Sequence, residues 1–240
     1  MRSTPAPGSA DLPAGSTEPP GVAAASTARS DRTARARIRD AAITRFAADG
    51  VAATSIRAIA AEADVSPGLV IHHFGSKDGL RAACDAHVAA RIRQAKQQAV
   101  AAGAALDPIG ALRAASQGPP VLRYLARTLA EASPQVAALV DELVDDAVAY
   151  QADGVRTGML TESDDPRGRA VVLTMWSLGA LVLHEHVARL TGVDLTEDPA
   201  TSGAWVVPAT EALARGVLAE EIYDRVRDGF AAEEDGHDGR

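Results

Sequence analysis

Apolar positions in this chain recur mostly at three- and four-residue steps, the spacing that places side chains on one face of an α-helix. In the segment 32–49, Ile38, Ala42 and Phe46 follow this spacing. Gly50 then ends the predicted helix, as a glycine after a helix C-terminus commonly does. Long alternating runs of β-branched residues, which would predict strands, do not occur in the sequence. The pattern therefore predicts an all-α protein.

Helix-breaking residues divide the pattern into about nine predicted helices. The predicted helices are 32–49, 55–63, 67–74, 77–102, 107–116, 120–132, 134–158, 166–191 and 203–228. Pro208 lies early in the last of them, where it either kinks the helix or marks a later start.

Composition predicts where the folded domains begin and end. Residues 1–28 are rich in Ala, Pro, Ser, Thr and Gly, and residues 231–240 are polar and acidic, so both segments are predicted to be disordered tails. Between these tails we expect an N-terminal domain at 29–80 and a larger helical domain at 81–230.

Charge divides the chain in a similar way. Residues 28–81 contain nine basic and six acidic side chains, a net charge of +3. Residues 82–240 contain fourteen basic and twenty-four acidic side chains, a net charge of −10. A basic module joined to an acidic body favours binding of nucleic acid by the N-terminal domain alone.

The remaining composition limits the class of protein. Hydrophobic residues make up 47% of the chain and aromatic residues only 3%, so the core is predicted to be aliphatic. Cys84 is the single cysteine, which excludes an internal disulfide and a cysteine-based zinc site and fits a reducing cytoplasm. No apolar run reaches the roughly 18 residues of a membrane span, and we find no secretory signal. We therefore expect a cytoplasmic protein without a membrane partner.

The segment 54–74 predicts two helices that cross at a tight turn. Their inward positions are Ile56, Ile59, Ala60, Ala63, Val70 and Phe74. The small residues on this face permit a close crossing, and Val65 fills the turn. Asp64 lies where the turn needs a positive φ, which Asp tolerates better than most residues. By spacing alone, a helix-turn-helix and an ordinary helical hairpin both fit.

From Arg32 to Ala90 the chain resembles the DNA-binding domain of TetR (tetracycline-repressor-like) regulators. The matching residues are Ala41, Phe46, Gly50, Thr54, Ser55, Ile56, Arg57, Ile59, Ala60, Val65, Ser66, Pro67, Gly68, His73, Phe74, Ser76, Lys77, Asp78 and Leu80. The resemblance covers about a quarter of the chain, while the rest matches only in length, helicity and acidity. Ile71 departs from it, because family members usually have an aromatic residue there. A phosphate contact at that position is therefore either missing or supplied by His72.

The resemblance and the physical chemistry of the side chains together predict the residues that contact DNA. For base edges in the major groove the candidates are Pro67, Gly68, Leu69 and His72, and Ser66 is a further candidate for contact with DNA. For phosphates they are Thr54, Ser55, Arg57, His73 and Lys77. Each of these has a solvated or capping role as its alternative, and His73 has packing in the interior as another. The basic run from Arg29 to Arg39 is either a DNA-contacting arm or a solvated flank.

The predicted helix 166–191 is apolar around more than one face, so it needs cover from two sides. With 203–228 as its companion, it resembles the dimer interface of the family, in which two helices from each subunit pack together. We therefore expect a homodimer through these two helices, and a monomer with a thick core is the alternative. A dimer also predicts a pseudo-palindromic operator.

The segments 120–158 and 166–191 carry the candidates for binding a small-molecule effector. These are Tyr124, Arg127, Tyr150 and Trp176, and packing at a core edge is the alternative for each. His184 and His186 are two positions apart and point in different directions on a helix, so no metal site is predicted there. No cofactor is predicted, and Cys84 is interpreted as a core residue.

These observations predict a sequence-specific DNA-binding transcription regulator, most simply a repressor that a small-molecule effector releases from its operator. Two alternatives share the fold: regulation by a protein partner, or activation of transcription. A helical enzyme is the third alternative. The sequence lacks a nucleotide-binding glycine loop, a Gly-x-Ser-x-Gly elbow and a His-Glu-x-x-His motif, so we do not expect an enzyme.

Overall fold

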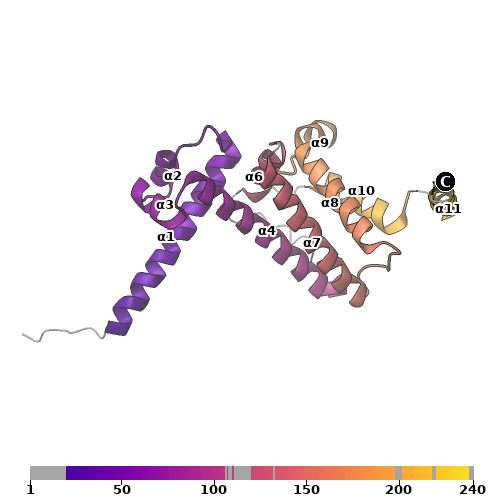
Figure 1. The fold of residues 1–240 in the computed structure, drawn as a ribbon, viewed down its shortest axis with the longest axis horizontal. Coiled ribbons are helices and arrows are strands. Elements are labelled where there is room, and N and C mark those ends of the chain that lie inside the picture. The colour runs from indigo at the N-terminus through magenta and orange to yellow at the C-terminus, as the bar shows by residue number, and fades with distance from the viewer. Residues whose placement is uncertain are drawn as a thin grey trace, which may run out of the picture.

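The computed structural model describes the backbone of residues 20–105, 107, 110, 120–131, 133–197, 202–217 and 220–237. Side chains are described within 31–103, 120–131, 133–197, 202–217 and 221–229, and at 105, 107 and 110. The α-helices in these ranges are α1 (Pro20–Asp49), α2 (Ile56–Glu62), α3 (Pro67–Phe74), α4 (Lys77–Ala102), α6 (Val121–Leu129), α7 (Pro134–Arg156), α8 (Pro166–Val182), α9 (His184–Thr191), α10 (Gly203–Arg215) and α11 (Glu220–His237), with a 3-10 turn η1 (Gly103–Ala105) after α4. No strand occurs in these ranges, and the predicted all-α class is confirmed (Figure 1).

The N-terminal domain is α1, α2 and α3 packed around one aliphatic core. Ile38, Ile43, Ile59 and Val70 are fully buried there, and the predicted face of α1 is the buried one. Asp64 has φ 51°, as the turn between α2 and α3 requires, and it is the only non-glycine residue with positive φ in the described part of the chain. The sequence pattern of the turn is therefore confirmed.

Two serines cap the second and third helices, which was the alternative role given for each of them. The Ser55 side chain accepts a hydrogen bond from the Ala58 amide at 3.1 Å. Ser66 does the same for the Leu69 amide at 3.2 Å, with Pro67 in the first position of α3. Because these caps satisfy amides that lack a partner within the helix, they fix where each short helix begins.

Helix α4 joins the two parts of the molecule. Its first turns pack on α1 and α3, and its remaining length packs on α7 (Figure 1). Leu80, Cys84 and Val88 lie fully buried along it, within the same core that contains α1. Burial raises the pKa of the Cys84 thiol to about 12, which is the state of a core residue and not of a reactive thiolate.

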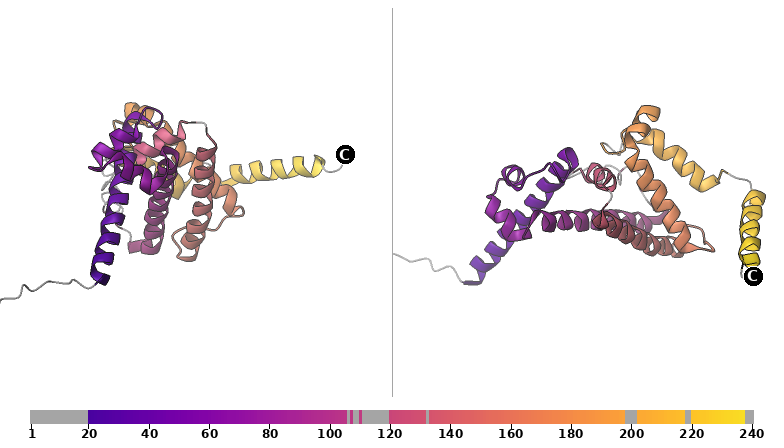
Figure 2. Two further views of the ribbon diagram at one scale, coloured as in Figure 1. Left: turned by 60° about the vertical axis from the view of Figure 1, so that its left-hand side comes forward. Right: turned by 45° about the horizontal axis from the view of Figure 1, so that its top comes forward.

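The body is formed by α6, α7 and α8, with α9 and α10 at one side. Helix α7 packs between α4 and α8, and α6 contacts both α8 and α1. Figures 1 and 2 show α11 standing apart from the other helices. No single described helix is long and apolar enough to cross a membrane, and the pair α8 and α9 reaches the required length only across a 74° bend.

Several helix limits differ from those expected. Helix α1 begins at Pro20, whereas Arg32 was the expected start, so residues 20–28 are helical and the expected tail is shorter. Proline suits the first turn of a helix, and alanines follow it. Residues 1–19 and most of the expected helix 107–116 lie outside the described residues.

Two long helices expected from the sequence are each divided into two. The first breaks at Leu183, after which His184 turns to pair with Asp194 at 3.2 Å. The second breaks after α10, where Gly216 has φ 71°, a backbone conformation that favours glycine. Pro208 lies within α10 and does not end it. Helix α11 continues to His237, so residues 231–237 are helical where a tail was expected.

Candidate nucleic-acid interface and internal cavity

The exposed surface of α3 agrees with a reading role. Ser66, Pro67, Gly68 and His72 are exposed at the start and on the surface of α3. Leu69 is half-buried and packs against the core of the domain. The exposed set offers few hydrogen-bond donors, so the geometry favours apolar contact and recognition of DNA shape over a dense hydrogen-bond code.

The start of α2 presents two exposed polar side chains next to α3. Arg57 is exposed and forms no hydrogen bond or ion pair with any residue that the structure describes. Ser55 is also exposed, and its hydroxyl hydrogen remains available because the cap uses only its oxygen as an acceptor. Backbone amides at a helix N-terminus add to the attraction for an anion.

Three of the residues predicted to bind phosphate have other roles in the structure. Thr54 is buried, and its hydroxyl donates to the Gly50 carbonyl at 2.7 Å. His73 is almost fully buried, with its Nε2 3.5 Å from a carboxylate oxygen of Asp31 on α1. Lys77 is half-buried and donates to the Ala52 carbonyl at 3.2 Å. These side chains hold the domain together, because their polar atoms face protein groups.

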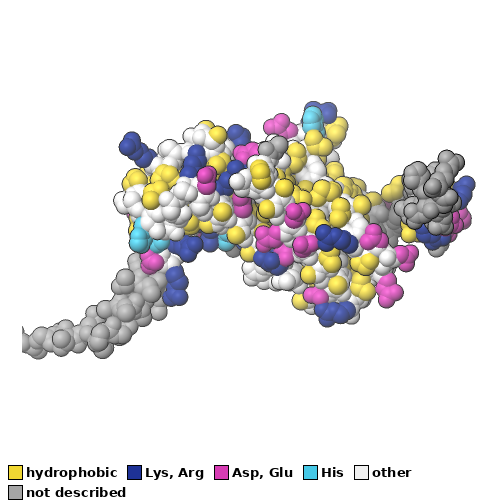
Figure 3. All heavy atoms as spheres, viewed as in Figure 1, with side chains coloured by type: hydrophobic (Ala, Val, Ile, Leu, Met, Phe, Trp, Pro, Cys, Tyr) yellow, Lys and Arg dark blue, Asp and Glu magenta, His cyan; other side chains and the backbone are white. Residues whose placement is uncertain are grey.

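Some arginines of α1 contact other parts of the domain, and others are exposed. Arg37 donates to the carbonyls of Ala63 at 3.2 Å and Asp64 at 2.9 Å, so it holds the turn before α3. Arg35 is exposed and lies 5.3 Å from the ring centre of Phe74, beside the end of α3. Figure 3 shows basic and histidine side chains gathered where α1 leaves this domain. Only part of the basic run is therefore free to meet DNA.

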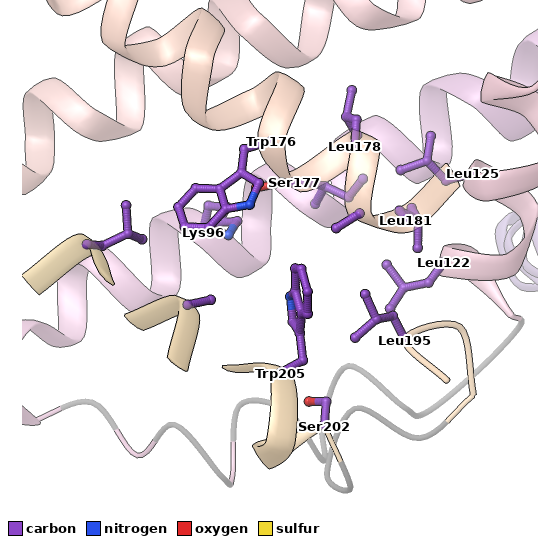
Figure 4. A pocket seen from close by; sticks show the side chains of 14 residues that line it. Lys96, Leu122, Leu125, Trp176, Ser177, Leu178, Leu181, Leu195, Ser202 and Trp205 are labelled. Atoms are coloured by element: carbon purple, nitrogen blue, oxygen red, sulfur yellow. The ribbon is translucent and has the colours of Figure 1, made fainter. Parts of the chain in front are cut away.

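The body contains a cavity of about 340 Å³ between α4, α6, α8 and α10. Leucine side chains of α6 and α8 form much of its wall, and among the described residues Lys96 of α4 is the only charged one that lines it. Trp176 and Trp205 both point into this space (Figure 4). Trp176 was predicted from the sequence as a ligand residue, whereas Lys96 and Trp205 were missed.

The other three predicted ligand residues lie elsewhere. Tyr124 is fully buried, and its hydroxyl donates to Asp85 at 2.6 Å. Arg127 is exposed, and its guanidinium lies close to Gly50. Tyr150 lines a smaller cavity of about 80 Å³, which shares Lys96 with the larger one. Burial raises the pKa of Tyr150 and keeps its hydroxyl protonated.

Two family models match this chain. Residues 38–84 match the bacterial regulatory proteins of the tetR family, and residues 117–219 match the tetracyclin repressor-like C-terminal domain. The first match contains α2 and α3, and the second contains α6, α7, α8 and α10, of which α6, α8 and α10 line the cavity.

Similar proteins agree with these matches. The HTH-type transcriptional regulatory protein RaaS of Mycobacterium tuberculosis is 37% identical over 196 residues, which are 79% of this chain and 89% of that protein. The HTH-type transcriptional regulator BetI of Paraburkholderia xenovorans is 39% identical over 80 residues, 33% of this chain and 40% of that protein.

The fold is similar to a solved TetR-family transcriptional regulator from Rhodococcus sp., with a TM-score of 0.53 and 22% identity over 74% of this chain and 98% of the other. At this identity the likeness concerns the fold alone. The match to RaaS over most of both chains, together with the two family models, shows the family. The chain belongs to the TetR family and is a DNA-binding transcriptional regulator.

Proposed function

We propose that this regulator is a homodimeric repressor that leaves its operator when a small molecule occupies the cavity in its body. The observation that supports this most directly is the position of α6. One face of this helix lines the cavity through Leu122 and Leu125. Its opposite face packs on α1 of the DNA-binding domain.

The coupling runs through a small set of buried contacts. The ring of Tyr124 lies 6.4 Å from that of Phe46 on α1, and its hydroxyl donates to Asp85 on α4. Burial raises the pKa of Asp85, although the Tyr124 hydroxyl and the nearby Arg81 act in the opposite direction. A ligand that displaces α6 therefore disturbs a tightly packed joint, which transmits small shifts because packed cores are not freely deformable.

For the operator, we propose that the exposed residues Ser66, Pro67, Gly68 and His72 read the major groove. Ser55 and Arg57 position the domain on phosphates. The cytoplasm, where the chromosome lies, is the compartment that this role requires. Two copies of α3 about one DNA turn apart predict a pseudo-palindromic site.

For the dimer, the supporting observation is an uncovered apolar surface on α8 and α9. Val172 is 65% exposed, Leu183 54% and Leu190 72%. Large apolar side chains exposed in this number on one subunit are typical of a protein interface. We propose that a second copy covers it, with the described helices α8, α9 and α10 in the contact.

Binding to labelled DNA from beside the protein's own gene tests the first half of this proposal. We expect specific binding that weakens steeply with salt, and unrelated DNA of equal length to bind more weakly. Equal weak binding to both DNAs across the salt series would contradict operator recognition.

The second half needs a variant that fills the cavity and leaves the DNA-binding surface unchanged. Ala209 lines the cavity on α10, far along the chain from α2 and α3, so Ala209→Phe is suitable. A compound that releases the natural protein from DNA should not release this variant. If it releases both equally, the effector site lies elsewhere.

A further inference from the structure

Lys96 places one positive charge in a cavity whose other described lining residues are uncharged and mostly apolar. No aspartate or glutamate is among the described residues that line it. Within the described part of the chain, the Lys96 ammonium has no hydrogen bond and no ion pair. Arg93, one turn earlier on α4, contrasts with it, because Arg93 pairs with Asp146 at 2.9 Å and with Glu142 at 3.6 Å.

Lys96 lies at the wall of this cavity, where its side chain is exposed to solvent. Desolvation by the protein atoms around the site nevertheless lowers its pKa. The described residues supply no partner for this charge, so an anionic group that enters the cavity can pair with it.

The two tryptophans supply the second feature of the site. Trp176 and Trp205 are the only tryptophans in the chain, and both line the cavity. Figure 4 shows their indoles and the Lys96 side chain directed into one space. Indole faces bind flat or extended apolar groups well. A volume of about 340 Å³ is at the lower end for small-molecule pockets.

We propose that the cavity binds a small organic anion, a carboxylate or sulfonate with a flat apolar body, whose acid group pairs with Lys96 while its body lies against Trp176 and Trp205. This inference rests on the proposed function for the consequence of binding, because the anion is then the effector. The binding itself is independent of DNA. A neutral or cationic ligand does not satisfy the free ammonium.

Two fluorescent probes of similar shape test the role of charge. The anion 8-anilino-1-naphthalenesulfonate and the neutral N-phenyl-1-naphthylamine share one aromatic framework and differ in the sulfonate. Energy transfer from tryptophan reports binding near Trp176 and Trp205, since the chain has no other tryptophan. We expect the natural protein to bind the anion at least about tenfold more tightly than the neutral probe.

The chain offers a matched control for the charge, because it contains two lysines only, Lys77 and Lys96. Lys96→Met should weaken binding of the anion about tenfold and leave the neutral probe unchanged. Lys77→Met should bind both probes like the natural protein. Lys96→Arg, which keeps the charge, should restore at least part of the anion affinity. Equal anion affinity in the natural protein and Lys96→Met would overturn the proposal.

Two further measurements test where the probe binds and whether the Lys96 charge is unpaired. Ala209→Phe, which fills the cavity, should lose both probes, and unchanged anion binding in it would place the probe elsewhere and overturn the proposal. Lys96→Met should melt at the same temperature as the natural protein or higher, since it removes an unpaired charge. A clear loss of stability would show that Lys96 serves a structural ion pair, and the proposal would fail.

The DNA assay separates this inference from the proposed function. If Lys96-dependent anion binding is found but no anion of this class releases the operator, the repressor mechanism fails and the anion site stands. If operator release is found with a ligand that binds Lys96→Met and the natural protein equally, the repressor mechanism stands and the anion site fails.

Discussion

The N-terminal domain and the helices α8 to α10 differ in how completely one chain buries its apolar side chains. In the N-terminal domain, Phe46, Ile59 and Val70 are almost completely buried. In the second, α10 has no buried residue at all, and Leu190 and Val207 are mostly exposed. Both regions are aliphatic, so composition does not explain the difference. The first is complete within one chain, and the second has an exposed apolar face, which the proposed dimer would cover.

This difference also determines how the two regions respond to mutation. A mutation in a core that one chain forms alone lowers the free energy of unfolding by the same amount at every protein concentration. A mutation in a surface that a second copy covers changes stability by an amount that depends on protein concentration, because association contributes to the stability of the dimer. Protein concentration is therefore the variable that separates the two regions.

Phe46→Ala should have the largest effect, because it removes an aromatic ring from the joint between α1 and α6. We expect a loss of about 3–5 kcal/mol in the free energy of unfolding. Urea unfolding followed by circular dichroism measures it, and the loss should be the same at low and high protein concentration. A loss below about 1 kcal/mol would show that this joint is looser than its burial indicates.

Val172→Glu should have the next largest effect, on assembly and not on the fold of the subunit. A carboxylate in the exposed face of α8 opposes burial against a second copy, since an unpaired charge there is costly. Sedimentation should find monomers, and operator affinity should fall roughly a hundredfold because two reading helices no longer act together. Met159→Glu is the control, an apolar-to-acid change in the segment after α7. A fully dimeric Val172→Glu protein would remove the basis of the comparison.

The same difference shows how far the sequence can predict this molecule. The limits of α3, the caps Ser55 and Ser66 and the positive φ of Asp64 follow from local rules, because each depends on a few neighbouring residues. The break at Leu183 was missed, since helical spacing continues across it. The break at Gly216 was also missed, although the glycine itself is a local signal for it.

Site residues were predictable only where local structure decides exposure. Arg57 and His72 lie on surfaces that helical spacing locates, whereas Thr54 and His73 face partners nine and more than forty positions away in the chain. Lys96 and Trp205 come together from segments more than a hundred residues apart. Sequence alone shows only that Lys96 is one of two lysines in the chain and lies in the predicted helix 77–102.

Arg57→Ala should have a moderate effect that is confined to DNA binding. We expect a loss of about tenfold in operator affinity, and a fall of roughly one in the slope of affinity against salt, as for the loss of one phosphate contact. Fluorescence anisotropy with labelled DNA measures both quantities. Arg167→Ala is the matched control on the body, where Arg167 is exposed and pairs with Asp145 at 3.0 Å. Equal effects of the two variants would show that the acidic body also contacts DNA.

Ser66→Ala and Ser133→Ala should have the smallest effects, and together they test whether the two regions unfold as one. Ser66 caps α3 in the N-terminal domain, and Ser133 caps α7 in the body through the Val136 amide at 3.4 Å. Each change should cost about 1 kcal/mol, because each leaves helix amides without their side-chain acceptor.

The two probes of unfolding differ usefully here. Both tryptophans lie in the body, so their fluorescence follows the body alone, while circular dichroism follows all helices. Because Phe46 and Tyr124 are buried against each other across the joint, we expect Ser66→Ala to shift the fluorescence transition as well as the circular dichroism transition. If Ser66→Ala moves only the circular dichroism signal, the domains unfold separately and α6 does not couple them. The route proposed from cavity to DNA would then lose its physical basis.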